Sequence, residues 1–184
     1  MSELNAIGGV ELSSIAKGYE TADLMLKTAN VKLLLSRSIC PGKYLVLISG
    51  EVGDVNASIE AGANAASYCL ADNFVIPNVH PGVFPAIENT VIAQSPGALG
   101  VIEAFSVSAI IEAADAAAKA SDVKLIEIRI AMAIGGKGFA VMTGGVAAVQ
   151  TSVAAGAALV AKKGLLVDKV VIPNPKKELF GENI

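Results

Sequence analysis

The chain has 184 residues and a formal net charge of -3; 53% of its residues are hydrophobic, but only 4% are aromatic and none is Trp. This length allows one large domain or two of about 90 residues, and two cysteines with one histidine exclude a disulfide scaffold and a histidine-rich metal site within one chain. Lys and Arg are neither in excess nor clustered, which argues against a nucleic-acid-binding surface.

The first half of the chain begins with an apolar strand, expected from about Ala6 to Leu12. Ser14 is a favourable N-cap, and it predicts a helix that ends at Thr28. Two β-rich runs follow, Val31 to Ser38 and Lys43 to Ser49. They flank Ile39-Cys40-Pro41-Gly42, so we expect a hairpin with its turn at that tetrapeptide.

An Ala-rich helix is then expected from Val55 to Leu70, and a strand from Phe74 to Ile76. Cys69 falls late in that helix and is interpreted as a small buried residue. The order strand, helix, strand, strand, helix, strand is the split βαβ, ferredoxin-like arrangement of the α+β class. Its helices cover one face of an antiparallel sheet.

The second half of the chain repeats the first, at an offset of 92 positions that grows by two and then by two more. We therefore predict two copies of one domain, residues 1–90 and 97–184, joined by a linker in which Pro96-Gly97 breaks the chain. Matched positions include Glu11 and Glu103, Asp23 and Asp115, Lys27 and Lys119, Leu33 and Leu125, Gly42-Lys43 and Gly136-Lys137, Gly62 and Gly156, Asp72 and Asp168, and Val75-Ile76-Pro77-Asn78 and Val171-Ile172-Pro173-Asn174.

The longest uncharged stretch, Gly138 to Ala161, is long enough to cross a membrane. Gly144-Gly145 divides it into a strand-like run from Phe139 to Met142 and an Ala-rich helix, which favours a packed soluble segment. Met1 to Gly9 carries no signal-peptide pattern. We therefore expect a cytoplasmic protein that contacts no membrane.

No set of catalytic residues is predicted, and we do not expect an enzyme. Gly135-Gly136-Lys137-Gly138 lacks the GxxxxGK[ST] spacing of a phosphate loop and is interpreted as a hairpin turn. His80 has no Ser or Cys nucleophile near it in the sequence, so it is interpreted as a structural or surface residue. Asp23 with Lys27, and Asp115 with Lys119, are spaced as helix ion pairs.

Five short motifs follow one another along the first half of the chain: Gly8 to Glu11, Asp23 with Lys27, Gly50-Glu51-Val52-Gly53-Asp54-Val55, Ala61-Gly62-Ala63 and Val75-Ile76-Pro77. Together these motifs resemble the shell domain of bacterial microcompartments (BMC). Because the pattern occurs twice and is not permuted, the chain resembles a tandem BMC shell protein. The resemblance implies a homotrimer that imitates a hexagonal shell tile, a pseudohexamer with two of six domains from each chain. Ser38-Ile39-Cys40-Pro41-Gly42-Lys43 resembles the iron-sulfur type from the propanediol-utilisation compartment.

Cys40 is the candidate metal ligand. A [4Fe-4S] cluster takes about four thiolates, and one chain holds only Cys40 and Cys69. Three chains around a threefold axis bring together three Cys40 thiolates, with the fourth iron left to water or a small ligand. The resemblance places this turn at the central pore. The alternative is a structural thiol at the same position.

The resemblance also assigns the pore lining and the tile edges. The second-copy loop is two residues longer and has no thiol, so the six pore loops are of two kinds. Lys27 and Lys119 match the edge lysine of the family, while Asn78 and Asn174 stand where typical members carry Arg. The pore-lining residues expected are Ser38, Ile39, Cys40, Pro41, Gly42, Ala133, Ile134, Gly135 and Gly136.

The function expected from this resemblance is that of a trimeric shell tile with one [4Fe-4S] cluster per trimer, passing electrons or the cluster across the shell. Its expected partners are copies of itself, other BMC shell proteins at the tile edges and a redox enzyme inside the compartment. A tile with a metabolite-conducting pore and no cluster is the alternative. A soluble ferredoxin-like regulatory protein is the third hypothesis.

Overall fold

A computed structural model describes residues 5–92, 97–130 and 135–183 of the chain. The chain divides into two compact units between Val79 and His80. Unit 1 lies before this point and unit 2 after it, and each is described by itself. Among the described residues, no helix is both long and apolar enough to cross a membrane.

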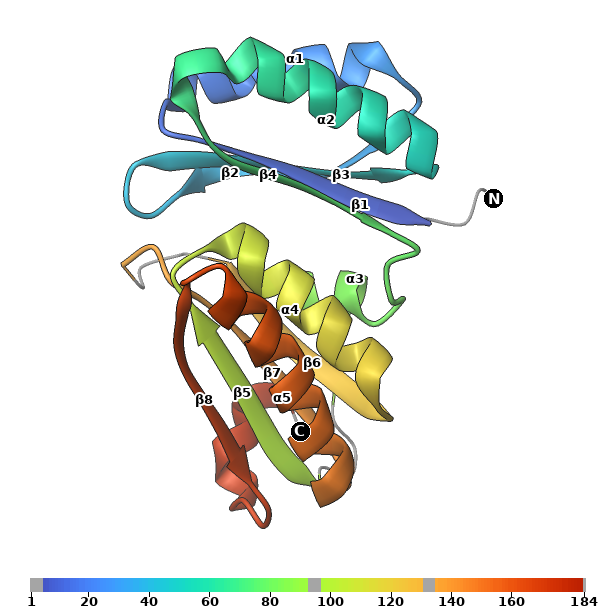
Figure 1. The fold of residues 1–184 in the computed structure, drawn as a ribbon, viewed down its shortest axis with the longest axis vertical. Coiled ribbons are helices and arrows are strands. Elements are labelled where there is room, and N and C mark those ends of the chain that lie inside the picture. Colours follow the sequence, from blue (N-terminus) through green and yellow to red (C-terminus); the bar gives the residue numbers. More distant parts are fainter. Residues whose placement is uncertain (1–4, 93–96, 131–134, 184) are drawn as a thin grey trace. The chain divides into compact units, whose positions relative to one another are not determined.

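Unit 1 is a four-stranded antiparallel sheet in the order β2-β3-β1-β4, with helices α1 and α2 over one face (Figure 1). This is the predicted ferredoxin-like arrangement. Ser14 caps α1 as expected, because its hydroxyl accepts a hydrogen bond from the amide of Lys17 at 3.3 Å. The elements are β1 (Ala6–Leu12), α1 (Ile15–Thr28), β2 (Lys32–Ile39), β3 (Lys43–Gly50), α2 (Val52–Ala66), the 3-10 turn η1 (Ser67–Cys69) and β4 (Leu70–Pro77).

Helix α2 differs from the prediction at both ends, since it begins at Val52 and ends at Ala66. Ser67 has a positive φ of 48°, which a helix cannot continue through, and Cys69 therefore lies in η1 rather than in the helix. Strand β4 is longer than expected because it pairs with β1 along its whole length, from Ala6 opposite Pro77 to Leu12 opposite Leu70.

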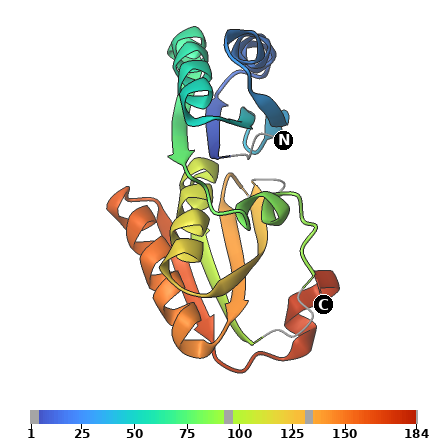
Figure 2. The same cartoon turned by 90° about the vertical axis from the view of Figure 1, so that its right-hand side faces the viewer.

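Unit 2 repeats this architecture, with the strand order β6-β7-β5-β8. Figure 2 shows α4 and α5 on one side of its sheet and the C-terminal turn η2 on the other, where Phe180 packs against Leu99 and Ile126. The elements are α3 (Val83–Ile87), β5 (Ala98–Ala104), α4 (Val107–Ala120), β6 (Val123–Ile130), β7 (Gly138–Gly144), α5 (Val146–Lys162), β8 (Leu166–Ile172) and η2 (Lys177–Asn183).

The two glycines at equivalent positions of α2 and α5 explain one match in the repeat. A Cβ at Gly62 would lie 2.7 Å from the side chain of Met25 on α1. A Cβ at Gly156 would lie 2.6 Å from the carbonyl oxygen of Ala113 on α4. In both units the two helices thus approach each other closely at a glycine, which has no side chain. The large share of small residues in the sequence permits this close packing of helices.

Candidate functional site

The loop between β2 and β3 is the predicted hairpin turn, and it contains Cys40. Ile39 is paired with Lys43 in the sheet, so Cys40, Pro41 and Gly42 form the turn. Ile39 is buried, whereas Cys40 is partly exposed and carries a free thiol. Gly42 has a φ of +69°, which a residue with a side chain rarely adopts. The Cys40-Pro41 peptide bond is cis.

An ion pair fixes the base of this loop. Nζ of Lys43 lies 2.7 Å from Oε1 of Glu11 on β1, whose side chain is only 4% exposed. The other carboxylate oxygen of Glu11 is buried and has no hydrogen-bond partner among the described residues. Next to Lys43, the Tyr44 ring is buried and its hydroxyl lies 2.9 Å from Ser36 Oγ. Burial raises the pKa of Tyr44 above the ordinary value.

The equivalent loop of unit 2, between β6 and β7, has the same ion pair at its base but a different sequence at its tip. Nζ of Lys137 lies 2.6 Å from Oε1 of Glu103, which is more exposed than Glu11. Gly135 and Gly136 both have positive φ, at 65° and 82°. The predicted pore residues Ala133 and Ile134 lie outside the described residues. The described part of this loop therefore matches the first in its ion pair and contains no thiol.

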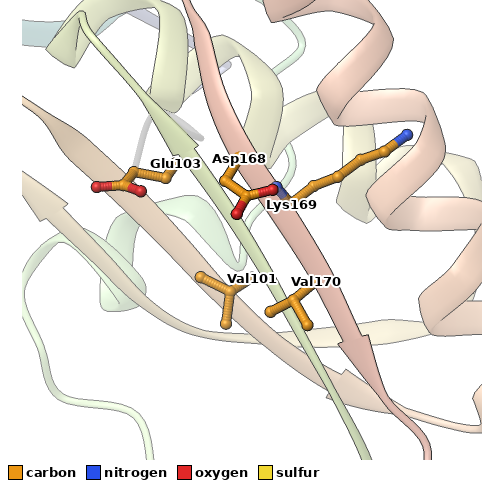
Figure 3. A pocket seen from close by; sticks show the side chains of 5 residues that line it. All are labelled: Val101, Glu103, Asp168, Lys169 and Val170. Atoms are coloured by element: carbon orange, nitrogen blue, oxygen red, sulfur yellow. The ribbon is translucent and has the colours of Figure 1, made fainter.

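Each of these glutamates has an aspartate beside it on the neighbouring strand, since Glu11 is opposite Asp72 and Glu103 is opposite Asp168. In unit 2 the second pair borders a shallow depression of about 130 Å³ whose apolar wall is Val101 and Val170 (Figure 3). The ammonium of Lys169 points away from Asp168 in that view. The depression is too small for a drug-sized ligand.

All four predicted tile-edge residues, Lys27, Lys119, Asn78 and Asn174, are exposed. Lys27 pairs with Asp23, and Lys119 with Asp115, each at 2.6 Å, so the helix ion pairs form as the spacing predicted. Asn78 has a positive φ of 51°. These positions are therefore open to a neighbouring molecule, and their role in tiling stays a prediction.

Cys69 and His80, the two remaining residues discussed from the sequence, lie in environments that suit structural roles. Cys69 is 2% exposed, so the prediction that it is buried is confirmed. His80 accepts a hydrogen bond at Nδ1 from the amide of Gly82, and its own amide donates to Oδ1 of Asp115 at 2.7 Å. No group of three or more His, Cys, Asp or Glu side chains suited to a metal ion occurs among the residues that the structure describes. A cluster on Cys40 thus requires more than one chain.

The structure thus consists of two tandem ferredoxin-like units, each built on a four-stranded antiparallel sheet. The BMC domain family matches residues 6–79 and 98–175, and the chain belongs to this family.

The chain is 44% identical over 179 residues to the bacterial microcompartment shell protein PduT of Citrobacter freundii, covering 97% of each chain. It also resembles the crystal structure of a microcompartment protein from Desulfitobacterium hafniense, with a TM-score of 0.89, 52% identity and coverage of 95% of this chain and 97% of that one. A fused permuted hexameric shell protein is a more distant match, with a TM-score of 0.61, and shows the fold alone. The chain is therefore a PduT-like, tandem BMC-domain shell protein.

The sequence correctly predicted a hairpin turn that contains Cys40, but it did not reveal the ion pairs at the bases of the two loops. The signal was present, because Glu11 and Lys43 both recur in the second copy as Glu103 and Lys137. The sheet register is needed to show that these matched residues contact each other.

Proposed function

We propose that this shell protein is a homotrimeric tile whose three Cys40 thiolates hold one [4Fe-4S] cluster at the threefold axis. The observation that carries the proposal is the position of Cys40, a partly exposed free thiol in a three-residue turn between two paired strands. Each chain offers one such thiol, so threefold symmetry supplies three ligands and leaves one iron to a non-protein ligand.

The surrounding residues fit this role because they hold the turn without blocking it. Ile39 is buried on one side of the loop and Tyr44 on the other, and the Lys43–Glu11 ion pair fixes its base. Pro41 and Gly42 are exposed and add little bulk. When bound, the cluster would supply one-electron chemistry. The contribution of this chain is to present Cys40 as a ligand and to keep the loop rigid.

As a tile of this kind, the protein lies in the shell of a microcompartment in the bacterial cytoplasm and passes electrons or the cluster across that shell. Lys27, Lys119, Asn78 and Asn174 contact other shell proteins at its edges, and a redox enzyme inside the compartment is its partner. The protein has no catalytic residue in this proposal. The alternative is a tile with a metabolite-conducting pore and no cluster.

The test is the amount of iron and acid-labile sulfide after anaerobic purification, with the native mass taken on the same sample. About four of each per three chains supports the cluster. A trimer with no iron, even after reconstitution with iron and sulfide, rejects the cluster and leaves the metabolite pore.

Two variants make this test specific. Cys40→Ala should lose the iron and keep the trimer. Cys69→Ala is the matched control, because that thiol is buried in unit 1 and should not contribute to iron content. Equal loss of iron in both variants would show that the assay reports folding rather than ligation.

A further inference from the structure

The two units are alike in fold and differ at one surface. Several apolar residues on the first helix and second strand of unit 1 are exposed. The residues 92 positions later, at the equivalent places in unit 2, are buried. Tyr19 is 66% exposed, whereas Ile111 is fully buried; Leu33 is 39% exposed, whereas Leu125 is 3% exposed. We call this exposed surface of unit 1 the α1 face. It consists of Ile15, Tyr19, Asp23, Leu26 and Leu33.

In unit 2 a segment of the chain is seated beside the equivalent surface. The residues that follow β4, His80 to Ile87, include α3, which packs on β6 and α4. The amide of His80 donates to Oδ1 of Asp115, and Val83 and Ala86 are fully buried. This segment thus combines one polar contact to the helix aspartate with an apolar anchor three residues later.

The equivalent aspartate of unit 1 has the same ion pair, but no segment among the described residues donates a hydrogen bond to it as His80 does to Asp115. Asp23 binds Lys27 through Oδ2, as Asp115 binds Lys119. Oδ1 of Asp115 accepts the amide of His80, whereas Oδ1 of Asp23 has no hydrogen-bond partner among the described residues. The Asp23 side chain is 64% exposed and that of Asp115 is 8% exposed.

The matching segment after β8 shares one backbone hydrogen bond with the segment after β4. By the repeat, Lys176 corresponds to His80 and Leu179 to Val83. The amide of Leu179 donates to the carbonyl oxygen of Lys176 at 3.0 Å, which reproduces the bond from Val83 to His80 at 3.0 Å. Leu179 is nevertheless 59% exposed, while Phe180 next to it is buried against its own sheet. The apolar anchor is therefore present and uncovered.

We propose that the α1 face of unit 1 binds residues Lys176 to Leu179 of a second copy of this chain. The amide of the second copy's residue 176 donates to Asp23, and its residue 179 packs among the apolar side chains of the α1 face. The contact joins different surfaces of the two copies, and such a contact closes a ring of three when its rotation is threefold, as the proposed trimer requires. This inference rests on the proposed trimer and names its contact.

The test uses the native mass of the full chain at a fixed concentration at which the unmodified protein is associated. Leu179→Glu and Leu33→Glu should each lose the associated species. Tyr68→Glu is the control, because Tyr68 is 89% exposed and lies outside the α1 face. Far-UV circular dichroism checks that each variant is folded. An unchanged native mass in both folded variants would overturn the inference.

Mixing the two variants tests the head-to-tail geometry. Leu33→Glu keeps an intact 176–179 segment and Leu179→Glu keeps an intact α1 face, so the mixture should form a dimer with one good contact. A contact between identical surfaces would not be restored by mixing, and a mixture that stays monomeric would contradict the proposal. Iron content is measured separately, so that the two proposals can fail independently. An associated protein without iron would reject the cluster and leave this contact in place. Intact, iron-bearing trimers of Leu179→Glu would reject only the contact.

Discussion

Lys43→Met should destabilise unit 1 by much more than Lys137→Met destabilises unit 2, although both remove the same ion pair of the repeat. Glu11 is 4% exposed, and removing the partner of a buried charge costs about 3–5 kcal/mol. Because Lys43 itself is 36% exposed and water reaches the pair, we expect about 3 kcal/mol, the lower end of this range. Glu103 is 30% exposed, so Lys137→Met should cost at most about 1 kcal/mol.

Urea unfolding distinguishes the two variants, because the tyrosines Tyr19, Tyr44 and Tyr68 all lie in unit 1 and the chain has no Trp. Tyrosine fluorescence therefore reports unit 1, while far-UV circular dichroism reports both units. For an m-value of about 1–3 kcal/mol/M, the expected loss lowers the fluorescence midpoint of Lys43→Met by roughly 1 M or more. Glu11→Gln combined with Lys43→Met should recover much of it, since no buried charge remains. Equal midpoints for Lys43→Met and the unmodified protein would refute the reasoning.

Two further predictions concern packing and pH. Gly156→Ala places a Cβ against the backbone of α4 and should cost about 1–3 kcal/mol by overpacking, whereas Gly62→Ala meets the flexible Met25 side chain and should cost less than about 1 kcal/mol; equal losses in urea titrations followed by circular dichroism would contradict this. Because burial raises the pKa of Tyr44, the folded chain holds that proton more tightly than the unfolded chain, so unit 1 should lose stability as the pH rises above about 10. Tyr44→Phe should make this fall shallower in urea midpoints measured from pH 8 to 11, and an unchanged slope would count against the assignment.

Local sequence signals were sufficient to predict those features in which one or two residues determine the backbone conformation. Ser14 predicted the start of α1 because an N-cap needs only its own side chain and the first turn. Pro41-Gly42 predicted the hairpin turn, since Gly42 takes a positive φ there. The repeat of motifs predicted two copies of one fold, and the βαββαβ order followed from one copy.

The features that the sequence did not predict depend on contacts between residues that are far apart in the sequence. The end of α2 has no Gly or Pro to mark it, and Ser67 takes its positive φ where the chain turns into the long pairing of β4 with β1. The ion pair between Lys43 and Glu11 requires the register of β1 and β3. The different environments of Asp23 and Asp115 are not visible in two matching helix patterns.

Residues 80–87 cover α4 of their own chain, whereas the segment proposed to cover the α1 face belongs to a second molecule. The two contacts therefore depend differently on protein concentration. The segment that packs on α4 is part of the same chain, so its effective concentration is fixed by the linker and dilution cannot remove it. The α1 face depends on a second molecule and is covered only above the dissociation constant of that contact. Dilution thus uncovers Tyr19 and Leu33 on the α1 face, and Leu179 near the end of unit 2, while residues 80–87 stay packed on α4. Adsorption and protease sensitivity in dilute solution should therefore rise at the α1 face and at residues 176–179, and not at α4.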